Sequence, residues 1–371
     1  MSRTADVVVI GGGIVGCTTA FFLAREGLRV VLLERVDVAS GTSSACGGWI
    51  LLQDKKDPHA AQRALESRRL YDLLEEEAQV RVLRTGGLMV AQDAQAWARL
   101  HAHAGALRAA GIRVQLLDGR AVREAEPALA DDLAGGLFCP DEAVVDPPGA
   151  CRRLAQAASE VGALVLTGHP AVAFDIEAGR IAGVRTPLER IAAPWVVVAC
   201  GVWSSEVAAL AGVPVSVVPR RGHIAVVREG ILRCPVLELD YLEARRATSL
   251  GLGFVAQPHP DGPTLVGSSR EFCGFVQTPE PAVVSRLWAR AVRFLPSLAS
   301  RQAERIVVGL RPYTPLGHPL VGRCGPEGFL LATGHEGEGV TLAPVTAALV
   351  RDLVTGRRDR TGWEPEGFPQ C

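Results

Sequence analysis

The stretch Asp6-Val-Val-Val-Ile-Gly-Gly-Gly-Ile-Val-Gly16 decides the fold of this 371-residue chain. Its apolar run predicts a buried strand that turns directly into a helix. The turn has the G-x-G-x-x-G spacing, whose glycines allow a tight turn, close approach of a pyrophosphate, and close packing of helix on strand. Because the helix beginning at Ile14 and Val15 directs its N-terminus at the phosphates, the stretch predicts a dinucleotide site. The fingerprint glycines are Gly11, Gly13 and Gly16.

An acidic residue completes this fingerprint. Glu34 ends the next apolar run, Arg29-Val-Val-Leu-Leu-Glu34, where it can accept hydrogen bonds from both ribose hydroxyls of an adenosine and would repel a 2′-phosphate. A glycine-rich turn in an ordinary α/β domain would not explain this acid. Residues 40–48 add small and hydroxyl side chains suited to a cofactor that extends beyond the first phosphate. The candidate contacts here are Arg35, Thr42, Ser43, Ser44 and Gly48.

Composition limits the class of protein and its partners. At 48% hydrophobic residues and a net charge of −1, the chain can bury a large core and is expected to form two domains. Lys55 and Lys56 are the only lysines, and no basic run could follow a phosphate backbone, so nucleic acid is not an expected partner.

The cysteines and apolar runs indicate the compartment. Nine cysteines are scattered without a C-x-x-C pair, which favours a reducing, cytoplasmic location and predicts no metal or iron–sulfur site within the chain. Residues 7–24 are uncharged, but their three consecutive glycines argue against a membrane span or a signal core. No transmembrane segment is therefore expected.

The order of predicted elements suggests a chain that crosses twice between two domains. The continuous apolar run Trp195-Val-Val-Val-Ala-Cys200 predicts a buried parallel strand that returns the chain to the first domain. Residues around 222–227 and 264–272 alternate as strands of a second domain do. The expected dinucleotide domain comprises residues 1–85, 145–220 and 305–371; the second comprises 86–144 and 221–304.

Two late motifs carry a family resemblance: Val308-Gly-Leu-Arg-Pro-Tyr-Thr-Pro-Leu-Gly-His-Pro319 and Ala332-Thr-Gly-His-Glu-Gly-Glu-Gly-Val-Thr-Leu-Ala-Pro344. With the fingerprint and Ala199-Cys-Gly-Val-Trp-Ser204, they resemble the D-amino-acid-oxidase-type FAD-dependent oxidoreductases over the whole chain. The resemblance implies an α/β fold, with a Rossmann-type FAD-binding domain and a strand-rich α+β substrate domain. Within the family, the second motif is most similar to amino-acid dehydrogenase subunits such as D-hydroxyproline dehydrogenase, the dye-linked proline dehydrogenase β subunit and opine oxidase.

The resemblance implies a role for Arg311, and the positions of other residues near the predicted strands suggest roles for them. Arg311 in Leu-Arg-Pro would hold the substrate carboxylate with a bidentate fork, although an arginine in a domain interface is the structural alternative. Tyr241 and Tyr313 are candidates to hydrogen-bond the substrate or close over it. Glu271 is expected to pair with Arg270. His223 is expected to be packed in the core.

The loop at residues 334–339 is expected to serve the flavin through its backbone N–H groups and the helix that begins near Val340. Side-chain catalysis by His335, Glu336 and Glu338 is the alternative. The remaining expected FAD contacts are Val172, Cys200, Gly201, Trp203, Gly334, Glu336, Gly337, Glu338, Gly339, Val340 and Thr341.

The family's chemistry is hydride transfer from the substrate's α-carbon to flavin N5, which leaves an imine. Where sarcosine-oxidase relatives carry a flavin-linking cysteine, this sequence aligns Arg311, and residues 262–269 lack their flavin-side lysine. Noncovalent FAD is therefore expected, without lysine-assisted reaction with oxygen. The preferred interpretation is a catalytic subunit of a hetero-oligomeric dehydrogenase for a secondary or D-amino acid, with FMN or iron–sulfur centres in partner subunits. A self-sufficient oxidase that makes hydrogen peroxide, and a noncatalytic FAD-holding scaffold, remain the alternatives.

Overall fold

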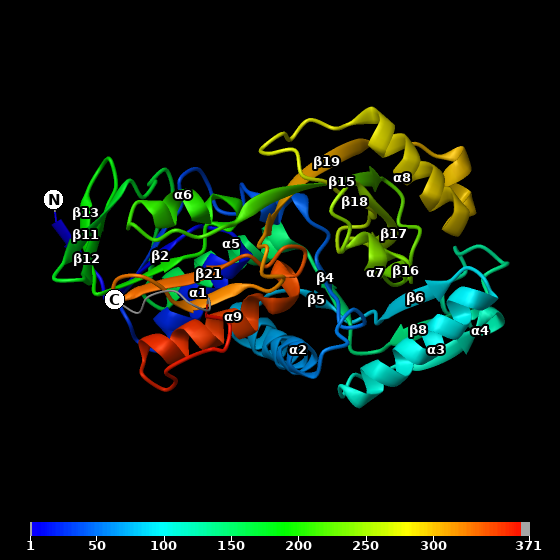
Figure 1. Ribbon diagram of the computed structural model, residues 1–371, viewed down its shortest axis with the longest axis horizontal. Coiled ribbons are helices and arrows are strands. Elements are labelled where there is room, and N and C mark those ends of the chain that lie inside the picture. Colours follow the sequence, from blue (N-terminus) through cyan, green and yellow to red (C-terminus); the bar gives the residue numbers. More distant parts are fainter. Residues whose placement is uncertain (1, 365–371) are drawn as a thin grey trace.

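The computed structural model describes residues 2–364, so the extreme ends of the two outer expected segments lie outside the described residues. Figure 1 shows two lobes joined by long strands. The lobe that contains the N-terminus is built on a six-stranded sheet in the order β10-β3-β2-β14-β21-β20, parallel except for β20. Its strands are β2 (Val7–Ile10), β3 (Val30–Leu33), β10 (Leu164–Leu166), β14 (Trp195–Val198), β20 (Leu320–Arg323) and β21 (Phe329–Thr333).

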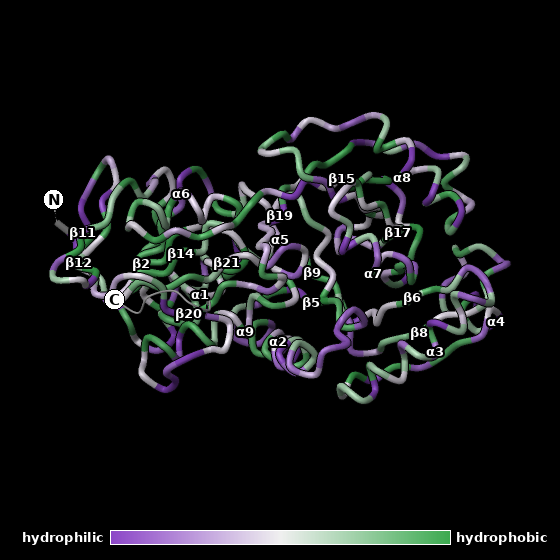
Figure 2. Tube along the Cα trace, in the orientation of Figure 1, coloured by the Kyte–Doolittle hydropathy of each residue, from purple (hydrophilic) through white to green (hydrophobic). Residues whose placement is uncertain are grey.

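The apolar runs form this sheet because both of its faces are buried. Val7 and Val9 pack into the core under the helices, whereas Val8 and Ile10 face the opposite core. A strand covered on both faces has no polar side, which explains the uninterrupted hydrophobic runs (Figure 2). The helices on the first face are α1 (Ile14–Arg25), α5 (Pro147–Glu160) and α9 (Gly339–Val354), with α2 (Pro58–Ala78) packed against α9.

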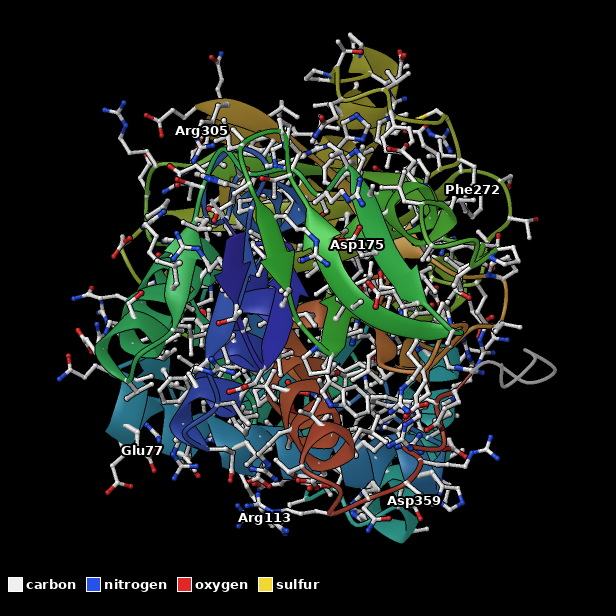
Figure 3. All side chains as sticks on the ribbon, turned by 90° about the vertical axis from the view of Figure 1, so that its left-hand side faces the viewer. Glu77, Arg113, Asp175, Phe272, Arg305 and Asp359 are labelled. Atoms are coloured by element: carbon white, nitrogen blue, oxygen red, sulfur yellow. The ribbon has the colours of Figure 1, made fainter. Side chains whose placement is uncertain are left out.

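A four-stranded sheet and a short helix cover the other face. Figure 3 looks toward this sheet, with Asp175 near its centre. The buried Asp175 carboxylate binds Arg185 and Arg190, each at 2.6 Å, which ties together three of the strands. The strand order is β1-β13-β12-β11. The elements are β1 (Ser2–Thr4), β11 (Ala173–Glu177), β12 (Arg180–Arg185), β13 (Arg190–Ala192), η2 (Gly201–Trp203) and α6 (Ser204–Ala209).

The second lobe is an eight-stranded sheet in the order β19-β15-β18-β17-β16-β6-β8-β7. Helix α8 (Pro281–Phe294) packs on it through Val283, Leu287, Ala291 and Phe294, whose spacing places them on one helix face. The strands are β6 (Gly87–Ala91), β7 (Gln115–Asp118), β8 (Gly135–Cys139), β15 (Val218–Val227), β16 (Val236–Glu238), β17 (Gly251–Pro258), β18 (Thr264–Arg270) and β19 (Arg305–Tyr313). The further helices here are α3 (Ala94–Ala109), α4 (Gly119–Ala125), α7 (Tyr241–Ala244) and η3 (Pro296–Ser300).

The connections between the lobes position the site. Strand β19 pairs with β15 along its whole length, from Arg305 opposite Val226 to Tyr313 opposite Val218. It therefore belongs to the eight-stranded sheet, although it begins the segment that we assigned to the FAD-binding domain; the domain division stays a prediction. A small sheet of β4 (Trp49–Ile50), β9 (Ala143–Val145) and β5 (Val82–Leu83) lies between the two large sheets. Along the chain, β4 is preceded by the short helix η1 (Thr42–Ala45).

Within residues 2–364, no helix is both long and apolar enough to cross a membrane.

Candidate active site

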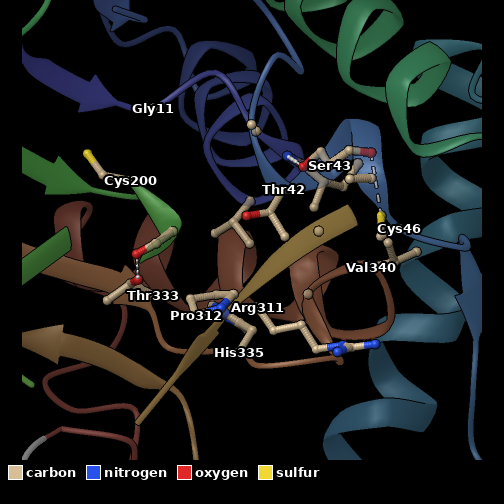
Figure 4. Close-up of a pocket in the computed structure, with 18 of the residues that line it drawn as sticks. Gly11, Thr42, Ser43, Cys46, Cys200, Arg311, Pro312, Thr333, His335 and Val340 are labelled. Atoms are coloured by element: carbon tan, nitrogen blue, oxygen red, sulfur yellow. Dashed lines mark hydrogen bonds between the residues drawn. The ribbon is translucent and has the colours of Figure 1, made fainter. Parts of the chain in front are cut away.

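A cavity of about 630 Å³ receives side chains from both lobes (Figure 4). The fingerprint turn and Glu34 line one part of it, and Tyr241 and Arg311 line another. The cavity therefore joins the predicted dinucleotide site to the predicted substrate site. Most of the expected contacts line it: Gly11, Gly13, Ile14, Val15, Glu34, Arg35, Thr42, Ser43, Gly48, Cys200, Gly201, Trp203, Glu336, Gly337, Gly339 and Val340.

The dinucleotide end is shaped by backbone. Gly11 has a φ of +115°, and a Cβ there would lie 2.4 Å from the Ala199 carbonyl oxygen. A Cβ on Gly16 would lie 1.8 Å from the Gly11 oxygen, so this residue sets the packing of α1 on β2 without lining the cavity. The N-cap residue of α1 is Gly13, which has no side chain, and Gly13, Ile14 and Val15 line the cavity. A cradle of this shape and polarity fits a pyrophosphate.

Glu34 is placed for an adenosine ribose. One of its carboxylate oxygens accepts a hydrogen bond from the Gly12 N–H at 2.7 Å, and the other accepts from the Val36 N–H at 2.9 Å. Each oxygen retains a lone pair that can accept from a ribose hydroxyl. Nearby, the Arg35 guanidinium lies 3.8 Å from the centre of the Trp203 ring, and both line the cavity.

The middle of the cavity is built from hydroxyls and small residues. The Ser43 hydroxyl accepts from the Ile14 N–H at 3.0 Å, and the Thr42 hydroxyl donates to the Leu310 carbonyl at 2.7 Å. These bonds join the residues after β3 to α1 and to β19, so the middle of the cavity is fixed from both sheets. Burial raises the pKa of the Cys46 and Cys200 thiols to about 12, which keeps both protonated at neutral pH.

The loop before α9 and the start of this helix line the cavity, although the Glu336, Gly337 and Glu338 N–H groups of the loop already donate within the protein. Helix α9 has no side-chain cap at its N-terminus, so its first N–H groups are available to an anionic group. The side chains of this loop are engaged elsewhere. The buried His335 bonds to the Thr346 hydroxyl at 2.9 Å, and burial lowers its pKa to about 4. The Glu338 carboxylate forms ion pairs with Lys55 and Arg245.

Arg311 provides an available guanidinium at the other end of the cavity. Its Nη1 donates to the Ser269 carbonyl at 2.9 Å, and among residues 2–364 it forms no ion pair, because nearby Glu336 pairs with Arg220 and Arg270 instead. A Cβ on Gly222 would lie 2.1 Å from Nη1, so the absent side chain makes room for the guanidinium. Burial, reinforced by neighbouring Arg270, lowers the pKa of Arg311 to about 10. The group remains a cation at neutral pH.

The expected pairing of Arg270 with Glu271 is wrong. Arg270 Nε lies 3.1 Å from a Glu336 carboxylate oxygen, whereas Glu271 pairs with Arg221 at 3.1 Å. Consecutive residues of a strand direct their side chains to opposite faces, so Arg270 and its neighbour cannot meet there. His223 is buried as expected, and its Nδ1 lies 2.8 Å from the Ser269 hydroxyl.

Several expected contacts do not line the cavity. The Tyr313 ring packs against Phe272, with centroids 5.1 Å apart. Val172, directly before β11, is 46% exposed. The Thr341 hydroxyl accepts from the Leu51 N–H at 3.1 Å and thereby holds a segment that does line the cavity. The others outside the lining are Gly16, Ser44, Gly334 and Glu338.

Some lining residues were not predicted from the sequence. Arg270, Gln257 and Ser268 come from the middle of the eight-stranded sheet, where strand pairing alone decides what faces the cavity. Trp49 lies just beyond the small-residue stretch and has no motif of its own. Within the described part of the chain, no cluster of three or more histidine, cysteine or acidic side chains could hold a metal ion.

Comparison with known proteins identifies the class. A sequence model of the FAD dependent oxidoreductase family (DAO) matches residues 6–353. The chain therefore belongs to this family, and the predicted D-amino-acid-oxidase-type fold, FAD dependence and enzymatic class are confirmed. It is 31% identical to a glycine oxidase of Pseudomonas putida, over 98% of each chain. It is also 27% identical to the bifunctional protein ThiO/ThiG of a Nostoc strain, but spans only 53% of that protein's length.

Solved structures agree on the fold. The glycine oxidase of Bacillus cereus superimposes with a TM-score of 0.87 at 25% identity, covering 97% of each chain. The L-proline dehydrogenase of P. horikoshii superimposes with a TM-score of 0.89 over 98% of each chain, and its 23% identity supports the fold alone.

Proposed function

We propose that the protein oxidises the C–N bond of a small secondary or D-amino acid, such as D-hydroxyproline, proline or sarcosine. The observation that carries this proposal is Arg311, a cation in the cavity whose guanidinium has only a backbone carbonyl as partner among the described residues. A planar guanidinium with unused donors matches a substrate carboxylate. A noncatalytic scaffold would have no use for such a group.

In this proposal, the protein's own residues bind and orient the substrate. Arg311 would hold the carboxylate, and Tyr241, which also lines the cavity, would donate a hydrogen bond to the same group. Fixing the carboxylate also orients the α-carbon and the amine. Holding the reacting atoms in this orientation lowers the entropic part of the barrier to hydride transfer. When bound, FAD supplies the acceptor for the hydride from the α-carbon, leaving an imine product.

The cofactor would be held without a covalent bond. Gly11, Gly13 and Glu34 would hold the adenosine diphosphate, and the uncapped start of α9 would face the flavin ring. The aligned linking position is occupied by Arg311, whose side chain cannot form a thioether. Acid precipitation should therefore release FAD into the supernatant; flavin that stays on the denatured chain would contradict this.

We further propose that electrons pass to partner subunits that carry FMN or iron–sulfur centres, in the cytoplasm. No lysine is found among the described residues that line the cavity, and Lys55 is buried in ion pairs with Asp54 and Glu338. The loop motif at residues 333–339 is the other support. The similarity to glycine oxidases favours a second candidate, a self-sufficient oxidase that produces hydrogen peroxide.

Anaerobic reduction followed by reoxidation tests both parts. The yellow protein is mixed without oxygen with proline, hydroxyproline, sarcosine, glycine, opines and D-amino acids, and bleaching identifies the substrate. The reduced enzyme is then mixed with a dye or with oxygen. Turnover with the dye should exceed turnover with oxygen at least about tenfold, or roughly 1.4 kcal/mol in barrier. Rapid reoxidation by oxygen with stoichiometric peroxide would establish the oxidase alternative.

A further inference from the structure

The hydroxyl of Tyr241 is held by a buried arginine. Tyr241 begins helix α7 and lines the cavity, and its hydroxyl oxygen lies 2.8 Å from Nη2 of Arg270. The guanidinium carbon also lies 4.7 Å from the centre of the tyrosine ring. The Arg270 side chain is only 1% exposed, so it acts on its neighbours and not on solvent.

The chemistry of the pair fixes the direction of this hydrogen bond. A guanidinium can only donate, so the tyrosine oxygen must be the acceptor. Its own proton then has to go elsewhere, and no described residue accepts it. Because Tyr241 lines the cavity, that proton is available to a bound molecule. Donation by a charged group also polarises the hydroxyl and makes it a stronger donor.

A carboxylate on the far side of Arg270 holds the arginine in place. Arg270 Nε bonds to Glu336 at 3.1 Å, and Nη1 bonds to the Ser268 hydroxyl at 3.2 Å. Burial alone would raise the pKa of Glu336, but Arg270, Arg311, Arg245 and Arg220 outweigh it and lower the pKa to about 2. The carboxylate is thus ionised throughout the neutral range. This anchor leaves Arg270 no freedom to turn away from Tyr241.

We propose that Arg270 is a positioning residue that orients the Tyr241 hydroxyl as a donor to the substrate carboxylate held by Arg311. The inference rests on the proposed function, because it assumes a carboxylate ligand at Arg311. The carboxylate would be bound by the guanidinium of Arg311 and by the polarised hydroxyl of Tyr241, while Arg270, which also lines the cavity, would act on the carboxylate through its hydrogen bond to Tyr241. Its effect on binding passes through Tyr241.

A double-mutant cycle tests this dependence. Tyr241→Phe should raise the substrate KM, and the Kd of acetate measured by calorimetry on the FAD-loaded protein, by about tenfold, since one hydrogen bond to a charged group is lost. Arg270→Met should raise both constants by about the same factor. In the Tyr241→Phe background, Arg270→Met should change them by less than about twofold.

Arg220→Met is the matched control. Arg220 also faces Glu336, at 3.5 Å, and is buried, but it forms no hydrogen bond to Tyr241. Arg220→Met should change the Kd of acetate by the same factor in the wild type and in the Tyr241→Phe background. If Arg270→Met does not fold, Arg270→Lys replaces it, because the lysine keeps the cation. This variant should show a smaller increase in Kd that is again abolished by Tyr241→Phe.

The outcomes separate the two proposals. If no amino acid bleaches the flavin and acetate does not bind, the proposed function fails. If a substrate is found but the effects of Arg270 and Tyr241 add, the positioning role is overturned. Additive effects together with a changed flavin midpoint potential in Arg270→Met would overturn it as well, and would assign Arg270 to the flavin.

Discussion

The two ends of the cavity are built from different parts of the chain and by different interactions. At the dinucleotide end, backbone makes the fit: Gly11 and Gly16 leave no room for a side chain, and the turn into α1 lines the space. At the substrate end, side chains make the fit: Arg270, Arg311 and Glu336 come from separate strands and a loop. The dinucleotide end depends on glycines that lack a side chain, and the substrate end depends on the placement of charged side chains.

This difference predicts two kinds of mutational effect. A substitution at the backbone-built end should remove the cofactor or the fold, because no nearby backbone can move away. A substitution at the side-chain-built end should change substrate binding and leave the cofactor in place. Buried Glu142, which holds residues 49–53, should make the free energy of unfolding depend on pH.

Gly11→Ala should have the largest effect. The added Cβ would lie 2.4 Å from the Ala199 oxygen, and the φ of +115° is unfavourable for alanine. Strain and overpacking together should cost about 2 to 6 kcal/mol of the free energy of unfolding, with loss of bound FAD. Urea unfolding and the FAD content after desalting measure both. Gly11→Ala protein that retains a full complement of FAD would contradict the backbone-built account.

Gly27→Ala is the control for this variant. Gly27 also has a positive φ, +80°, but a Cβ there would have no neighbour within 4 Å. It should cost only about 1 to 2 kcal/mol for the left-handed conformation. Its FAD content should match that of the wild type, so the comparison separates backbone strain from the steric clash.

The same difference explains what the sequence could predict. The fingerprint is contiguous, so its glycines and Glu34 could be predicted from spacing alone. Most of the candidate contacts at 40–48 were predicted from their small and hydroxyl side chains, but Ser44 does not line the cavity. Arg311 was predicted through its family motif. The pairing of Arg270 with Glu336 was not predicted from the sequence. Glu336 lies 66 residues away along the chain, and only the register of β18 directs the Arg270 side chain toward it. Ion pairs between distant strands follow from the folded sheet, and no local pattern in the sequence encodes them.

Glu142 holds the segment that runs from Trp49 to Gln53, of which Trp49 and Leu51 line the cavity. Its carboxylate accepts from the Trp49 indole at 2.9 Å, from the Leu52 and Gln53 N–H groups at 2.7 and 2.8 Å, and from the Gln53 amide at 3.0 Å. Burial raises its pKa to about 7, although these hydrogen bonds oppose the shift. The folded protein therefore keeps a proton that the unfolded chain releases at lower pH.

The sign of the pH effect follows from this raised pKa. The stabilisation is complete below the unfolded pKa, near 4.5, and is lost as the pH rises through about 7. Over that window, the free energy of unfolding of the wild type should fall by roughly 3 kcal/mol more than that of Glu142→Gln. Urea unfolding at several pH values measures the slope. Glu177→Gln, at an exposed site, should keep the wild-type slope; a wild-type slope in Glu142→Gln would refute the assignment.

Arg311→Lys should have the smallest effect in free energy. It should change substrate binding alone. The lysine keeps the positive charge but loses the planar fork, so one of the two hydrogen bonds to the carboxylate disappears. The substrate KM should rise by a factor on the order of 10 to 100, or about 1.4 to 2.8 kcal/mol. FAD content should be unchanged, because Arg311 lies at the end of the cavity that is built from side chains.

Steady-state kinetics with the substrate found by anaerobic bleaching measures this change. Arg113→Lys is the control: Arg113 is an exposed arginine whose side chain is paired with Asp141, and its replacement should leave KM at the wild-type value. Arg311→Ala should bind substrate more weakly than Arg311→Lys, because it loses the charge as well as the fork. If Arg311→Ala reduced its flavin with the wild-type rate and KM, the carboxylate would have to bind elsewhere. The substrate end would then no longer depend on placed charges, and the contrast between the two ends would be lost.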